Sequence, residues 1–181
     1  MRNRLARTLA LAALALTAAG KPAVDREVMA AIEKRFDRRI ESFSIDDPFY
    51  LLGTTRGFYL AGYGVVFTAE LNLVAAAVVT PFRPAFSKQQ IESLRQKKMA
   101  RVVELKKMMR DMLVDSATTL KEVPADQWVV VGVTLFYYGW EDKTGLPNQI
   151  LMQAKRQALL DFEAGRIGGA GLEAAIQLEE F

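Results

Sequence analysis

The 181-residue chain contains neither cysteine nor histidine. Without cysteine it can form no disulfide, no thiolate metal site and no cysteine nucleophile, so its stability must come from packing. Without histidine, a Ser-His-Asp triad and any histidine-ligated zinc, copper or haem are excluded. A bound metal would have to be a hard cation, calcium or magnesium, on oxygen ligands. We expect no cofactor.

The first twenty residues are typical of a secretory signal peptide. An apolar stretch at residues 9–19 precedes small residues suited to cleavage before Lys21, and it follows three arginines: Arg2, Arg4 and Arg7. The stretch is too short to span a bilayer, and a lipoprotein anchor would require a cysteine. We predict a signal peptide at 1–20, a single α+β domain at 21–181, and a secreted or periplasmic protein with no transmembrane span after cleavage.

The charge balance excludes one class of partner. The chain has 24 basic and 21 acidic side chains. Three of the basic ones lie in the signal segment, which contains no acid, so the mature chain has 21 of each and is formally neutral. The basic character expected of a nucleic-acid-binding protein is therefore missing. We expect no nucleic acid partner.

A β-hairpin is predicted between residues 56 and 74. Aromatic and β-branched residues favour strands at about 56–60 and 63–74, and glycine favours a reversal near Ala61-Gly62. The second strand has one uniformly apolar face, whereas Glu70 and Asn72 lie on the other. Such alternation is typical of a sheet with one solvated face. The alternative is that Glu70 lies at the floor of a cleft.

Two helices precede and follow the hairpin. Asp25 is a candidate N-cap for an amphipathic helix to about residue 42. Ser87 and Gln90 form a capping-box pattern for a long helix at 88–120. This helix is basic, and its charged face could bind an envelope protein or an anionic surface. The residues predicted for that contact are Lys97, Lys98, Arg101, Lys106 and Lys107.

The segment 127–138 is the strongest strand, and it is apolar on both faces, which predicts a central strand covered by helices. Gly132 within it would mark the close approach of another element. A helix at about 147–162 and a short helix at about 170–178 should follow. The expected fold is α+β: a small mixed sheet, made of the hairpin and a parallel central strand, packed with helices that include one long basic amphipathic helix.

The loop 139–148 is the predicted functional surface, because it leaves the carboxyl end of the central strand, where open sheets place ligand crevices. Its candidate binding residues are Tyr138, Trp140, Glu141 and Asp142, together with Glu70 on the hairpin. A non-catalytic binding module is the favoured function. The alternative is a carboxylate-based hydrolase that pairs Glu70 with Glu141 or Asp142.

Overall fold

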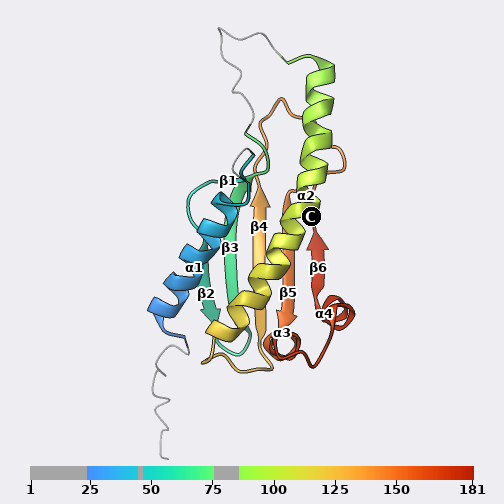
Figure 1. Ribbon diagram of the computed structural model, residues 1–181. Helices are drawn as coiled ribbons and strands as arrows, with labels where there is room; N and C mark the ends of the chain where they lie inside the picture. Colours follow the sequence, from blue (N-terminus) through green and yellow to red (C-terminus); the bar gives the residue numbers. More distant parts are fainter. Residues whose placement is uncertain (1–23, 45–46, 76–85) are drawn as a thin grey trace, which may run out of the picture.

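The computed structural model describes residues 24–44, 47–75 and 86–181. It is an α+β fold in which helices lie against one face of a six-stranded mixed sheet (Figure 1). The predicted signal peptide at 1–20 lies outside the described residues. The predicted fold class is confirmed.

The sheet is organised around two parallel strands, β3 (Gly64–Asn72) and β4 (Trp128–Leu135). On one side of β3 lie β1 (Tyr50–Leu51) and β2 (Arg56–Leu60), which pair with its two ends. On the far side of β4 follow β5 (Gln149–Lys155) and β6 (Gln177–Glu180). Every pairing except β3 with β4 is antiparallel.

Two long helices form the second layer. The first is α1 (Arg26–Glu41), capped by the Asp25 carboxylate. The second is α2 (Lys88–Thr119), which begins at the predicted capping box of Ser87 and Gln90. Both cross the same face of the sheet (Figure 1), and the core lies between them and the inward side chains of the strands. The first turns of α2 project beyond the end of the sheet.

The helix predicted at 147–162 is wrong in its first half. Residues 149–155 form β5, and only Arg156–Glu163 is helical, as α3. Ile150, Met152 and Ala154 are buried at alternate positions, which is the period of a strand. The short helix predicted at 170–178 is α4 (Gly169–Ala175), and its last residues belong to edge strand β6.

The expectation that helices cover both faces of the central strand is also wrong. On β3, Phe67, Ala69 and Leu71 face the helices and are buried, whereas Thr68 and Glu70 point the other way and are exposed. Among the described residues, no helix lies on the second face (Figure 1). Gly132 lies on this open face, and a Cβ there would meet nothing nearer than Leu151 Cδ1 at 3.5 Å. No other element of the described chain approaches Gly132 closely.

Within the described ranges, none of the helices has the length and apolarity that crossing a membrane demands.

Candidate functional site

The loop that follows β4 rises beside the projecting first turns of α2 (Figure 1). Both of its acidic residues contact that helix. Arg95 and Lys98, one turn apart on α2, are the two basic side chains that they meet. The predicted loop is therefore held to α2 at two points.

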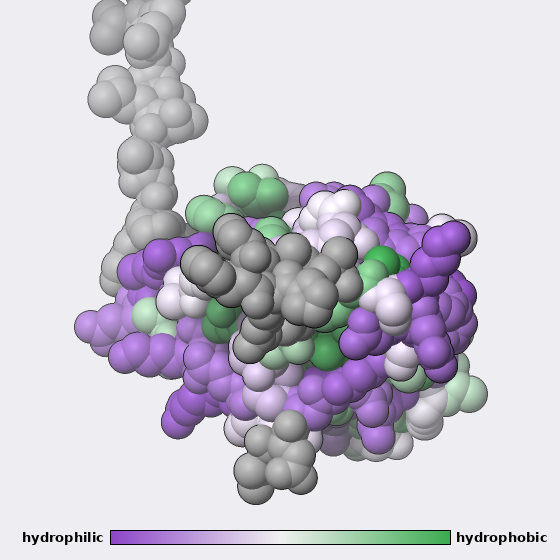
Figure 2. Space-filling model, turned by 90° about the horizontal axis from the view of Figure 1, so that it is seen from above, coloured by the Kyte–Doolittle hydropathy of each residue, from purple (hydrophilic) through white to green (hydrophobic). Residues whose placement is uncertain are grey.

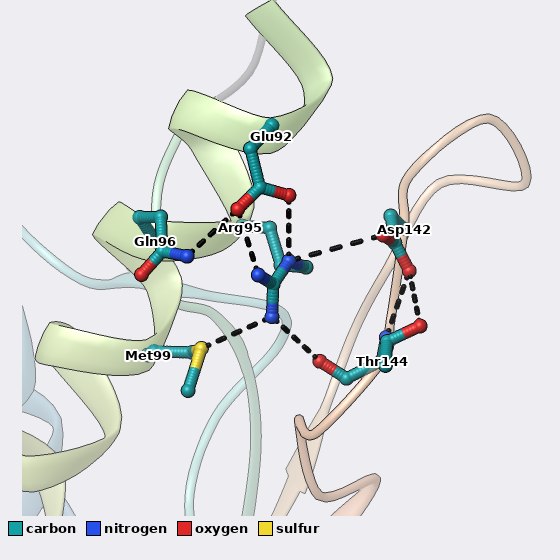
Figure 3. Close-up of polar contacts among 6 residues, drawn as sticks. All are labelled: Glu92, Arg95, Gln96, Met99, Asp142 and Thr144. Atoms are coloured by element: carbon teal, nitrogen blue, oxygen red, sulfur yellow. Dashed lines mark hydrogen bonds and ion pairs between the residues drawn. The ribbon is translucent and has the colours of Figure 1, made fainter. Parts of the chain in front are cut away.

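Arg95 forms the outer attachment (Figure 3). Its Nε and Nη2 donate to the Glu92 carboxylate at 2.9 and 2.7 Å, and its Nη1 donates to the Thr144 carbonyl at 3.1 Å. Asp142 lies 3.8 Å from Nε and accepts hydrogen bonds from the amide and hydroxyl of Thr144. The hydrogen bond from Arg95 lowers the pKa of Glu92 to about 2. The bonds from Thr144 lower the pKa of Asp142, so both carboxylates stay ionised at neutral pH.

Lys98 and Glu141 form the inner attachment, and they are buried. Nζ of Lys98 lies 2.5 Å from Oε2 of Glu141, and their side chains are 0% and 2% exposed. Glu141 Oε1 accepts from the Tyr138 amide, and the Lys98 ammonium lies 4.7 Å from the centre of the Tyr137 ring. Burial lowers the pKa of Lys98, while the hydrogen bond to Glu141 opposes that shift. Each charge thus has its counter-charge inside the protein.

A row of contacting aromatic rings runs from the end of β4, along the loop, to the segment before α2. Phe136 meets Tyr138 edge-on at 5.1 Å, and Tyr138 lies parallel to Trp140 at 5.9 Å. Trp140 in turn stacks on Phe86, just before α2, with ring centres 4.2 Å apart. Trp140 is partly exposed. It therefore neither caps the core as a fully buried residue nor stands free in solvent.

A groove of about 350 Å³ opens beside Trp140 at this end of the molecule. Its lining includes both apolar and polar residues: Val74, Phe86, Leu94 and Trp140, and Gln90, Ser93 and Lys97. Figure 2 views this end and shows hydrophobic patches that interrupt a hydrophilic surface. Phe86 and Leu94 were not among the predicted site residues. The only sequence feature that singled out Phe86 was its place just before the N-cap Ser87, where an apolar residue commonly packs on the first turns of the helix.

Glu70 does not join the loop. It lies on the open face of β3 and is exposed, whereas the carboxylate of Glu141 points into the helix layer toward Lys98. Glu141 is therefore not directed toward Glu70, and Asp142, the other candidate partner of Glu70, lies beside Arg95 and accepts hydrogen bonds from Thr144. In residues 24–44, 47–75 and 86–181, no three acidic side chains gather as a metal ion would require.

The predicted basic surface of α2 is largely neutralised within the protein. Lys97 pairs with Asp47 at 2.9 Å, and Lys106 pairs with Glu180. Arg101 is buried, donates to Glu104 at 2.9 Å, and its guanidinium lies 4.1 Å from the centre of the Phe49 ring. With Lys98 also buried, neither it nor Arg101 offers charge to a partner. Among the five, only Lys107 has no ion pair to a described residue.

No family model matches the chain, and no match to a curated protein or to a solved structure was found either.

Proposed function

We propose that this protein is an exported, non-catalytic binding module that takes a protein partner in the groove beside Trp140. The observation that carries the proposal is a partly exposed aromatic stack on a loop attached to α2 by two ion-paired contacts. Loops held in their binding conformation lose little entropy on association. Tryptophan and tyrosine in such a position are frequent binding hot spots.

The lining of the groove favours an extended peptide segment as its ligand. Val74, Leu94 and Trp140 would accept an apolar side chain, and Gln90 and Ser93 would bond the peptide backbone. The hydrolase alternative has no comparable support. Of the two candidate partners of Glu70, Glu141 is paired with Lys98 in the interior, and Asp142 is bonded by Thr144 beside Arg95.

Export is proposed from the pattern of residues 2–20. We expect native protein to begin at or near Lys21 and to fractionate outside the cytoplasmic membrane. N-terminal sequencing and intact mass of the native protein would check this. Retention of Met1 in a cytoplasmic protein would contradict it.

Trp140→Ala should abolish partner binding with little effect on stability. Because Trp140 is only partly buried, its truncation should cost clearly less than the about 3–5 kcal/mol typical of a core aromatic. The loss of a hot spot should weaken binding at least about thirtyfold. The measurement is capture of partners from envelope extract by immobilised mature protein, with the thermal midpoint of the same sample.

Trp128→Ala is the matched control, since Trp128 is also partly exposed but lies at the opposite end of β4. The proposal expects the same captured protein with wild type and Trp128→Ala, and its absence with Trp140→Ala. Equal capture by all three would reject the groove as the site. A fall in the thermal midpoint as large as that expected for truncation of a core aromatic would show that Trp140 has a structural role.

A further inference from the structure

The open face of the sheet displays large apolar side chains that no element of the described chain covers. Phe58 and Leu60 on β2 are 55% and 48% exposed, and Phe181, next to β6, is 62% exposed. Val66 and Leu151 on the strands between them are partly exposed. Exposed apolar side chains that gather on one face mark an interaction site. This face is distinct from the groove beside Trp140.

Two charges on the open face, Arg56 and Glu179, lie at opposite edges of the sheet, whereas Glu70 on β3 and Lys155 on β5 lie between them on other rows. One cross-strand row runs through the paired positions Arg56, Thr68, Gly132, Leu151 and Glu179. Both ends of the row are exposed, and neither has an ion pair or side-chain hydrogen bond to another described residue; Arg56 acts on Glu33 only at longer range. A basic end and an acidic end thus lie on one line, with β4 in the middle.

We propose that a second copy of this chain covers the open face, so that two sheets pack face to face about a two-fold axis parallel to the strands. With the axis over β4, edge strand β2 of one protomer faces β6 of its partner. Arg56 then faces the partner's Glu179, and the symmetry makes this contact twice. The two charged ends of this row are complementary to each other across the axis, and this complementarity favours a second copy as the occupant of the face.

The middle of the row suits this arrangement. Gly132 lies at the floor of a hollow of about 250 Å³, bordered by Thr68, Thr134, Leu151 and Phe181. Glycine at the centre of a strand allows another backbone to approach, and on the two-fold axis it would face its own copy.

The size of the face indicates a weak dimer. Five strand positions at about 4.8 Å and seven residues at about 3.3 Å cover roughly 550 Å² per protomer. This lies below the roughly 800 Å² per partner of a standard stable interface. We therefore expect self-association with a dissociation constant in the micromolar range.

The proposal is tested with charge-reversal variants of Arg56 and Glu179. Sedimentation velocity over a micromolar concentration series measures the dimer dissociation constant of each variant. Arg56→Glu or Glu179→Arg alone places like charges opposite each other twice and should weaken dimerisation at least about tenfold. The double variant Arg56→Glu/Glu179→Arg restores opposite charges and should recover the wild-type constant. Glu163→Arg, an equal charge change at an exposed position of α3, should leave it unchanged.

Three results would overturn the proposal: wild type that stays monomeric throughout the series, single variants that dimerise as wild type does, or a double variant that stays as weak as the singles. Thermal midpoints of all variants establish that each is folded. Dimerisation does not depend on the groove, so Trp140→Ala should dimerise normally. A failure of one proposal is therefore distinguishable from a failure of the other.

Discussion

Glu141→Gln should lower the free energy of unfolding by about 3 kcal/mol. The substitution keeps the shape of the side chain and removes its charge, which leaves the ammonium of Lys98, 0% exposed, without a counter-charge. Removing one partner of a buried ion pair typically costs about 3–5 kcal/mol. The low end applies because the amide oxygen can still accept a hydrogen bond from Nζ. Denaturant unfolding of both proteins at neutral pH measures the difference.

The pH dependence of this loss has a definite sign. Burial lowers the pKa of Lys98 in the folded protein, and losing Glu141 removes the interaction that opposes this shift. A lysine whose folded pKa lies below its unfolded value of about 10.4 destabilises the native state at low pH, and the penalty fades as pH rises from the folded to the unfolded pKa. The deficit of Glu141→Gln should therefore shrink toward alkaline pH.

The double variant Lys98→Met/Glu141→Leu is the control for this pair. It replaces both charges by apolar groups of similar length, an exchange that is often neutral or stabilising for a buried pair. We expect its denaturant midpoint to lie close to that of wild type. If Glu141→Gln itself unfolds at the wild-type midpoint, Lys98 has another source of compensation and the pair does not anchor the loop.

Local signals in the sequence were sufficient for the elements that they specify. Asp25, Ser87 and Gln90 fix helix starts through backbone bonds within a few residues, and both predicted starts are confirmed. The hairpin turn was found because Gly62 supplies a positive φ of 78°. The parallel pairing of β3 and β4 followed from the long helix between them.

The incorrect predictions concern segments whose structure is determined by contacts with distant parts of the chain. Residues 149–155 contain good helix formers, yet pairing with β4 draws them into the sheet. The apolar pattern of β4 could not show that no helix of the described residues covers its second face. Glu141 was predicted as a binding residue or as a catalytic partner of Glu70, and its burial against Lys98, 43 positions earlier, depends on a contact between distant parts of the chain. The position of the loop could be predicted because a loop must follow the end of the strand, whatever its side chains contact.

Gly64→Ala should lower the free energy of unfolding by more than about 4 kcal/mol, a size reserved for severe core defects. Gly64 begins β3 at φ 143°, a conformation open almost only to glycine. An added Cβ would lie 1.9 Å from the carbonyl oxygen of Trp128 and 2.7 Å from its nitrogen. These atoms belong to the backbone of β4, so relief requires the two parallel strands to separate.

Alanine variants of two other glycines distinguish the cost of steric overlap from the cost of backbone strain. Gly62 has φ 78° but no atom within 4 Å of an added Cβ, so Gly62→Ala should cost only the about 1–2 kcal/mol of a left-handed alanine. Gly132→Ala has ordinary φ and contacts of 3.5 Å or more, so it should be neutral or stabilise by up to about 1 kcal/mol. Denaturant midpoints of the three variants should fall in the order Gly132→Ala, Gly62→Ala, Gly64→Ala. A Gly64→Ala protein as stable as Gly62→Ala would show that β3 and β4 do not approach closely at Trp128, and that the parallel register begins later along the strands.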